Sequence, residues 1–387
     1  MGDTVKVTNF TPGPTPVPDL VLQTMAEPIL SHRSSDFSQL MTRIVKGLKY
    51  VFQTKQTVLP LTASGSGAME AAVVNLFSVG DRVLAIRSGK FGNRWVELCQ
   101  TFGLNTEVFD VEWGQSVDPQ EVRTFINKHG PFKGMFATHS ETSTGALHDV
   151  KSLGEIARES ECYFIVDAVS GLCANKFQTD DWFVDLALTG SQKGLMVPPG
   201  LSFIAVSEAA WQAIEKNNHP SYYFNLLKAR KALEKGLTPY TPAVSLLMGL
   251  SGALQIIEEM GLSKIRTIHE INAQITRAGV SALGLKLFAH TPSNVLTAVI
   301  MPDAIDGTAV LKTIKNDCGV MIANGMDHYK GKVIRISHLG YNIVPSDMLF
   351  ALSALEYGLA QHGHKFSTGT GVSAAQKLIL DNAKGRF

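Results

Sequence analysis

The sequence predicts an α/β protein in which a parallel or mixed sheet is covered by helices on both faces. Two observations lead to this prediction. Up to about residue 206, apolar segments of four to six residues alternate with longer amphipathic stretches. Beyond that point the pattern becomes mainly helical and then returns to short strands, which indicates a second, smaller α+β region.

The predicted strands of the large region are nearly all apolar, as expected for strands that are buried on both faces of a sheet. They come after an extended segment at Val58–Thr62 and comprise Val83–Ile86, Thr106–Val111, Met135–Thr138, Tyr163–Val166, Leu186–Thr189 and Leu201–Val206. The stretches between them predict helices at Ala68–Phe77, Arg94–Phe102, Pro119–Lys128 and Leu153–Arg158. This alternation is typical of a doubly wound sheet.

The two ends of the chain follow other patterns. Thr11–Pro18 contains too much proline for a helix or a central strand and predicts an extended arm. Ser207–Ile275 is predicted to be mainly helical, and the smaller region follows with Asn294–Met301, Thr308–Asn316, Val320–Ala323 and Val333–Ser337, of which the second is the helix. We therefore expect an arm over residues 1–20, a large domain over 21–260 and a small domain over 261–387.

Composition excludes several classes of protein. The 35 Lys+Arg and 34 Asp+Glu give a net charge of +1, so no long-range field attracts nucleic acid or an anionic membrane. No apolar run reaches the roughly 18 to 20 residues that span a bilayer. Charged residues make up only 18% of the chain, which indicates much hidden surface in a core or a subunit interface. The cysteines are far apart and no signal-peptide pattern is present, so we expect reduced thiols in a cytoplasmic protein.

Ligands of open α/β sheets bind beyond the carboxyl ends of the strands. One segment at such a position, Ser64-Gly65-Ser66-Gly67, follows an extended stretch and opens a helix. Its glycines allow close approach of an anion, and the helix start supplies N–H groups and the positive end of the helix dipole. The segment therefore predicts a phosphate cradle, although by itself it fits equally well a flexible turn with a capping serine.

Asp167 and Lys193 follow two other predicted strands. The Asp167 carboxylate suits a metal, a ribose, a heterocyclic cation or a helix cap, and we expect no metal because no second ligand lies at a suitable spacing. Burial of Lys193 would lower its pKa and provide a neutral amine that can form a Schiff base. A phosphate cradle, a carboxylate for a ring nitrogen and such a lysine are together what pyridoxal phosphate requires.

With these residues the sequence resembles the class V aminotransferases of fold type I. It is most similar to the alanine/serine–glyoxylate aminotransferase group, which includes bacterial relatives labelled soluble-hydrogenase small subunit. The resemblance covers nearly the whole chain and includes, in order, Thr11–Thr15, His32–Ser34, Ser64–Gly67 with Glu70, Thr138–Gly145, Val166–Ser170, Gly190–Lys193 and Val333–Ile336. It implies a mixed, mostly parallel seven-stranded sheet and pyridoxal phosphate as the cofactor. It also implies ping-pong transfer of an amino group from serine or alanine to glyoxylate or pyruvate.

The resemblance implies roles for single residues. Lys193 would hold pyridoxal phosphate as a Schiff base and shuttle a proton, and Asp167 would keep the pyridine nitrogen protonated. Arg335 would bind the α-carboxylate of the substrate, and Gly13 would lie close to the substrate. The other cofactor contacts would come from Ser64, Gly65, Ser66 and Gln192 at the phosphate, Thr142 near the ring hydroxyl, and Val169 and Phe91 on the two ring faces. Many family members have tryptophan in place of Phe91, and animal relatives have histidine in place of Ser66.

The same resemblance implies a homodimer with shared active sites. Tyr240 and Thr241 would reach the phosphate that is bound by the partner subunit. Three alternatives stay open at this stage. Arg33 could contact the side-chain carboxylate of an amino donor such as aspartate, or it could belong to a domain interface. Cys318 could be the nucleophile of a cysteine desulfurase, although a buried structural thiol is favoured. The chain could also be a cofactor-binding subunit without catalysis, against which the presence of Lys193, Asp167 and Arg335 argues.

Overall fold

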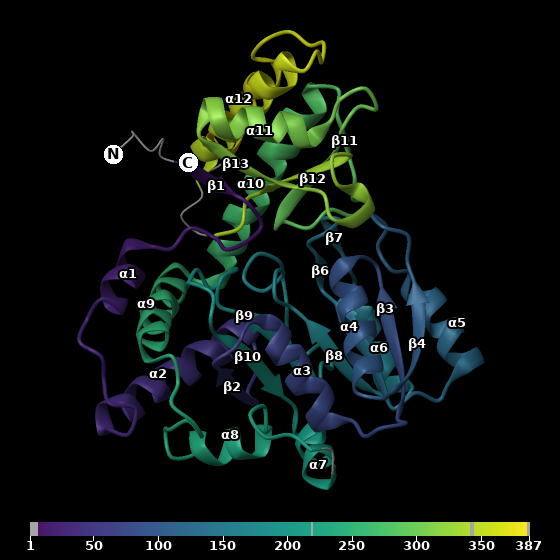
Figure 1. Ribbon diagram of the computed structural model, residues 1–387, viewed down its shortest axis with the longest axis vertical. Coiled ribbons are helices and arrows are strands. Elements are labelled where there is room, and N and C mark those ends of the chain that lie inside the picture. The colour runs from purple at the N-terminus through teal and green to yellow at the C-terminus, as the bar shows by residue number, and fades with distance from the viewer. Residues whose placement is uncertain (1–6, 218–219, 341–343, 385–387) are drawn as a thin grey trace.

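The computed structural model describes residues 7–217, 220–340 and 344–384, so parts of the predicted arm and small domain (1–6, 341–343 and 385–387) lie outside the described residues. A seven-stranded sheet occupies the centre of the large region (Figure 1). In spatial order its strands are β2 (Thr57–Leu61), β10 (Ser202–Val206), β9 (Leu186–Gly190), β8 (Tyr163–Asp167), β5 (Gly134–Thr138), β3 (Arg82–Arg87) and β4 (Asn105–Asp110). The five strands from β9 to β4 are parallel, whereas β10 is antiparallel to both of its neighbours. The predicted mixed, mostly parallel seven-stranded sheet is confirmed.

Helices cover both faces of this sheet because successive apolar residues of its buried strands point to opposite sides. In β8, Phe164 and Val166 pack with one group of helices and Ile165 packs with the other. The first group consists of α2 (Ser35–Phe52), α5 (Pro119–His129), α6 (Val150–Glu159) and α9 (Val244–Met260). The second consists of α3 (Gly65–Leu76), α4 (Lys90–Thr101), α7 (Glu208–Lys216) and α8 (Leu226–Leu233).

A second sheet forms the smaller region, which lies above the first in Figure 1. Its strand order is β1 (Thr8–Phe10), β13 (Val320–Asn324), β14 (Val333–Ser337), β12 (Leu296–Ile300) and β11 (Lys286–Leu287). The helices of this region are α10 (Leu262–Ala282), α11 (Gly307–Cys318), α12 (Pro345–Gln361) and α13 (Thr370–Lys384). The first strand comes from the arm and pairs in parallel with β13, Thr8 opposite Val320. The two-stranded β6 (Ser140–Glu141) and β7 (Ala146–Leu147) complete the strands of the described residues.

Each strand and helix predicted by residue range is present, with ends that differ by a few residues. Two helices near the start of the described chain were not predicted, α1 (Asp19–Met25) and α2. The second begins after Ser34, whose hydroxyl accepts the N–H of Phe37, and it buries Leu40, Ile44 and Leu48 at helical spacing. This helix packs against α9 and β2 and belongs to the layer on one face of the sheet.

We propose to keep the division at residues 260 and 261, since it falls at Gly261 between α9 and α10. The core of the small region is separate from the two cores that flank the large sheet. The arm connects the two domains, because β1 lies in the small sheet while Thr15 hydrogen-bonds the large domain.

Candidate active site

The carboxyl ends of β2, β3, β5, β8 and β9 meet at one edge of the large sheet, because these strands run in the same direction. A cavity lies at this edge. It is lined by Ser64, Gly65, Ser66, Met69, Phe91, Arg94, Ser140, Thr142, Asp167, Val169, Ser170, Gln192 and Lys193. The structure therefore brings together nine residues that the sequence predicted, from segments up to about 130 residues apart in the chain.

The start of α3 forms one wall of the cavity. Ser64 is the N-cap in an extended conformation, and the first helical turn offers N–H groups that have no partner within the helix. A Cβ atom on Gly65 would lie 2.9 Å from Cγ2 of Val169, so glycine is needed for this close approach. The side-chain amide of Gln192 lies beside this turn, with its Oε1 acceptor buried and unpartnered, so the donors of this wall are the backbone N–H groups and the serine hydroxyls. This wall has the donors and the free space to hold an anion.

Lys193 reaches into the cavity under the N-terminal arm. Its Nζ donates to the carbonyl oxygen of Pro12, and Gly13 is so close that a Cβ there would lie 2.6 Å from Nζ. Thr15 fixes the arm in place, since its N–H donates to the Gln192 carbonyl at 3.0 Å and its hydroxyl to the Lys193 carbonyl at 3.1 Å. Burial, and then the nearby Arg335 guanidinium, lower the pKa of Lys193 to about 8. The side chain thus loses its proton far more readily than an exposed lysine.

Asp167 occupies the end of β8 and is buried. One carboxylate oxygen accepts the N–H of Val169 at 2.8 Å. Burial raises the pKa of Asp167 to about 6, although the hydrogen bond from Val169 acts in the opposite direction. A buried carboxylate of this kind is stabilised by a cationic partner such as a protonated ring nitrogen.

Arg335 comes from the small domain and lies beside the cavity rather than in its lining. Its Nε donates to the carbonyl oxygen of Asn324 at 2.8 Å, and one terminal nitrogen donates to that of Thr142 at 2.9 Å. Burial lowers its pKa to about 10. Thr142, which lines the cavity, also shares a hydrogen bond of 2.7 Å with Ser170. Through Thr142 the small domain is in direct contact with the site.

The sequence did not identify every residue of the site. Met69, Arg94, Ser140 and Ser170 also line the cavity. Arg94 could have been found from its spacing, because it lies three residues after Phe91 in the first turns of α4 and therefore shares a face with it. Glu141 is buried behind this turn, where it accepts the N–H groups of Phe91 and Gly92.

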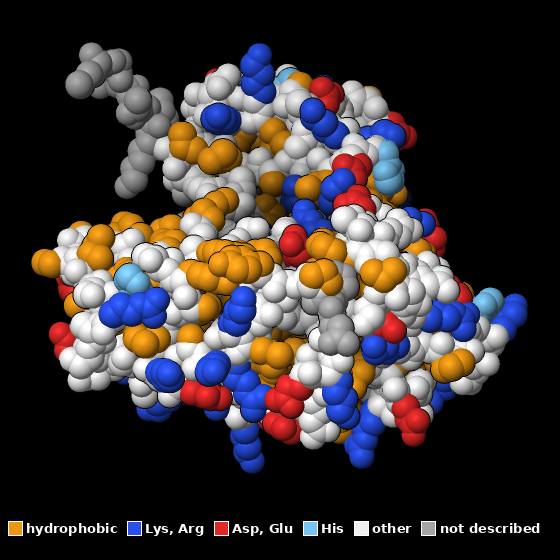
Figure 2. Space-filling model, turned by 60° about the horizontal axis from the view of Figure 1, so that its bottom comes forward, with side chains coloured by type: hydrophobic (Ala, Val, Ile, Leu, Met, Phe, Trp, Pro, Cys, Tyr) orange, Lys and Arg blue, Asp and Glu red, His pale blue; other side chains and the backbone are white. Residues whose placement is uncertain are grey.

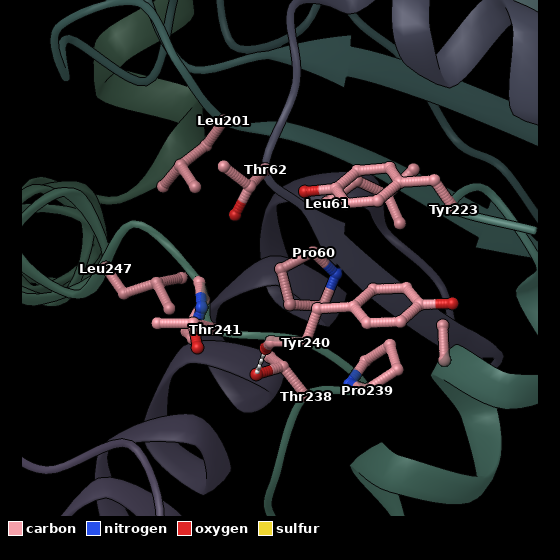
Figure 3. Close-up of a pocket in the computed structure, with 12 residues that line it drawn as sticks. Pro60, Leu61, Thr62, Leu201, Tyr223, Thr238, Pro239, Tyr240, Thr241 and Leu247 are labelled. Carbon is pink, nitrogen blue, oxygen red and sulfur yellow. Dashed lines mark hydrogen bonds between the residues drawn. The ribbon is translucent and has the colours of Figure 1, made fainter.

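Tyr240 and Thr241 lie in a different pocket of the same chain (Figure 3). This pocket is formed by the end of β2, Leu201 and the segment 238–242, with Tyr223 stacked on Tyr240 at 5.2 Å. Arg33 donates to the carbonyl oxygen of Thr238 at 3.2 Å, so its side chain contacts the segment 238–242. A single chain does not bring these residues to its own cavity, and their expected contact with a partner's phosphate stays a prediction.

Cys318 is the last residue of α11 in the small domain and does not line the cavity. Its side chain is only partly buried, so the full burial that we favoured is not found, because the end of α11 lies near the surface. Burial still raises the pKa of its thiol, which disfavours a reactive thiolate. The other three cysteines are buried and free.

Comparison with known proteins gives the family. Residues 7–343 match the family model of class-V aminotransferases. The chain is 41% identical to the soluble hydrogenase small subunit of a Synechococcus species, over 95% of this chain and 97% of that protein. It is 34% identical to a serine–glyoxylate aminotransferase of Methylorubrum extorquens, with 96% of each chain covered. The crystal structure of ureidoglycine–glyoxylate aminotransferase from Bacillus subtilis superimposes with a TM-score of 0.93 at 31% identity, covering 97% of this chain and 98% of that one.

The chain therefore belongs to the class-V aminotransferases, and it is a transaminase that depends on pyridoxal phosphate. The residues present fit this cofactor. The start of α3, with its free N–H groups, suits its phosphate, and Asp167 and Lys193 suit its ring nitrogen and its aldehyde. Within the described residues, no helix is long and apolar enough to cross a membrane.

Proposed function

We propose that this enzyme transfers the amino group of a small amino acid, serine or alanine, to glyoxylate or pyruvate in a ping-pong reaction. The observation that supports it best is the arrangement of one cavity, in which Lys193, Asp167 and the start of α3 meet and Arg335 lies alongside. The identity to a serine–glyoxylate aminotransferase over nearly the full length supports the choice of substrates.

In this proposal the cofactor and individual residues of the chain have different chemical roles. Pyridoxal phosphate supplies the aldehyde that takes up the amino group and a ring that accepts the electron pair of the substrate Cα–H bond. The Lys193 amine, whose pKa is lowered by burial, would hold the cofactor by its aldehyde and would serve as the base that moves a proton at the substrate carbon. The buried Asp167 carboxylate would keep the ring nitrogen protonated.

Ser64, Gly65, Ser66 and Gln192 would bind the phosphate, and Val169 and Phe91 would hold the ring between them. Thr142 would lie near the ring hydroxyl. Arg335 would bind the substrate α-carboxylate with the N–H groups that its two backbone contacts leave free. Gly13 would leave room for the substrate above Lys193, since any side chain there would occupy the space around Nζ.

We further propose that the enzyme is a cytoplasmic homodimer in which Tyr240 and Thr241 contact the phosphate bound by the partner. Exposed apolar side chains on the large domain support a subunit interface, among them Leu22, Ile29 and Tyr222, which are 48%, 72% and 74% exposed. Figure 2 shows such side chains gathered toward the left of the wide lower part of the molecule, the side on which α1 lies in Figure 1.

Replacement of Lys193 tests the function. We expect Lys193→Ala to abolish turnover of serine and alanine and to remove the visible absorbance that the bound cofactor gives. Lys176→Ala, at an exposed lysine of the same domain, is the control and should behave as the wild type. A spectroscopic screen of amino donors without an acceptor, aspartate included, identifies the donor. Wild-type rates in Lys193→Ala would refute the proposed function.

A further inference from the structure

A cation that the sequence did not single out lies at the phosphate side of the cavity. Arg94 belongs to α4, which begins directly beyond the end of β3, and it lines the cavity together with Phe91. One terminal nitrogen of its guanidinium donates to the hydroxyl of Ser66 at 3.1 Å. The guanidinium carbon lies 5.0 Å from the centre of the Phe91 ring. Arg94 therefore joins the start of α3 to the start of α4 across the wall of the cavity.

The start of α4, which carries Arg94, is held in place by Glu141. Glu141 is fully buried and accepts the N–H groups of Phe91 at 3.0 Å and Gly92 at 2.9 Å. Its other oxygen accepts the N–H of Ser143 at 3.1 Å. The first turn of α4 is thus bound to a buried carboxylate, and Arg94 projects from the next turn on the same face as Phe91. Because the Ser66 hydroxyl and the Phe91 ring already contact the guanidinium, Arg94 loses little conformational freedom when it binds an anion.

The charges of the cavity explain why a cation is needed there. Lys193 and Arg94 are the two cationic residues that line the cavity. Once Lys193 has formed its bond to the cofactor aldehyde, Arg94 is the one that remains to balance a phosphate dianion. Among the described residues Arg94 forms no ion pair with a carboxylate, so its charge is available. It is also close enough to act on the other groups, since it lowers the pKa of both Asp167 and Lys193.

We propose that Arg94 is a further binding residue for the phosphate of the cofactor, acting on it directly and through the hydroxyl of Ser66. This inference rests on the proposed function, because it requires pyridoxal phosphate in the same cavity. Arg94 also contacts the Phe91 ring, which would pack on the cofactor ring. The residue that would bind the phosphate is therefore in contact with a residue that would bind the ring.

The test compares two ligands that differ only in the phosphate. Apo enzyme is titrated with pyridoxal phosphate and with pyridoxal, and binding is followed by the absorbance that arises when Lys193 binds the aldehyde. For Arg94→Gln we expect the affinity for pyridoxal phosphate to fall by about tenfold or more, because a charge-assisted hydrogen bond is lost. The affinity for pyridoxal should stay within about twofold of the wild type. Inorganic phosphate should compete with pyridoxal phosphate in the wild type and less so in the variant.

Three further variants make the result specific. Phe91→Leu should weaken both ligands alike, because it alters the contact with the ring. Arg158→Gln is the matched control, since Arg158 also lies over a phenylalanine, at 4.4 Å from the Phe183 ring, but on the surface of α6. It should bind both ligands as the wild type does. Arg94→Lys retains the charge and should keep most of the preference for the phosphorylated ligand, and it serves as the test if Arg94→Gln does not fold.

Equal losses for pyridoxal phosphate and pyridoxal in Arg94→Gln would overturn the assignment and leave Arg94 a structural residue, with the proposed function intact. A wild-type enzyme that binds neither ligand would instead overturn the proposed function together with this inference.

Discussion

In the proposed function Arg335 binds the substrate carboxylate, and its contacts within the protein already fix its orientation. Two of its N–H groups are already engaged by backbone carbonyl oxygens, one from each domain, so the plane of the guanidinium is fixed. A fixed fork matches the two oxygens of a carboxylate, whereas an ammonium group presents a single charged point. The orientation of the guanidinium, and not only its charge, is therefore what this position provides.

Arg335→Lys should consequently raise the KM for the amino donor by about tenfold or more, because the lysine cannot maintain the two-pronged contact. Cofactor absorbance should be unchanged. Arg277→Lys is the matched control, since Arg277 also donates to backbone carbonyl oxygens, those of Pro292 and Ser293, and burial lowers its pKa to about 10 as well. This control should leave the KM as it is, and an unchanged KM in Arg335→Lys would remove the residue from the substrate site.

Single residues were predictable from the sequence where they stand at the end of an apolar strand. Asp167, Lys193 and Ser64 were found in this way, and the structure places them around one cavity. Arg94 was missed although its spacing from Phe91 indicated it, and Glu141 was missed because its importance depends on which segments meet in space. Glu141 acts on α4 from a segment about 50 residues further along the chain, and its spacing alone does not reveal that contact.

At the scale of elements, the start of α4 carries two residues that line the cavity and is itself held by a buried carboxylate. It follows the end of β3, carries Phe91 and Arg94, and is held by Glu141. Gly89 precedes the helix, and a Cβ at that position would lie 2.5 Å from the carboxyl carbon of Glu141. The helix therefore starts as close to the buried carboxylate as a backbone without a side chain allows.

Glu141→Gln should destabilise the protein by about 1–3 kcal/mol, since the amide NH₂ would face backbone donors in either orientation. Cofactor affinity should fall as well, because Phe91 and Arg94 move with the helix. Chemical denaturation and cofactor titration measure the two effects. Glu356→Gln is the control, as Glu356 accepts the backbone N–H groups of Gly369, Gly371 and Val372 in the small domain, none of which lines the cavity. It should lose stability but keep its cofactor affinity.

The helices and strands of the large sheet were predictable because each has a regular apolar pattern of its own. β1 was not, because three residues beside a proline-rich segment carry no such pattern and become a strand only through pairing with β13. This difference affects the site, because the sequence analysis treated residues 1–20 as an arm separate from both domains. In the structure this arm is an edge of the small sheet at Thr8–Phe10 and a contact of Lys193 at Pro12.

At the scale of the whole molecule, the low charged fraction and the exposed apolar side chains point to the same conclusion. A chain with 18% charged residues exposes Ile29 and Tyr222 by more than two thirds of their surface. Tyr223 and Tyr240 line the pocket that contains Thr241, and Tyr222 stacks on Tyr240 beside it. A homodimer would cover this surface and bring the segment 238–242 to a second cavity, which is where the proposed function places it.

Mixing two inactive variants tests whether the sites are shared. Lys193→Ala lacks the lysine, and the double variant Tyr240→Phe, Thr241→Val lacks the polar groups expected at the partner's phosphate. In a hybrid dimer, the subunit with native Lys193 receives native Tyr240 and Thr241 from its partner, so one complete site is formed. We expect refolding of the two variants together, at limiting cofactor, to yield activity that neither yields alone. If Tyr240 and Thr241 instead act within their own chain, no hybrid contains a complete site, and the mixture would stay as inactive as its components.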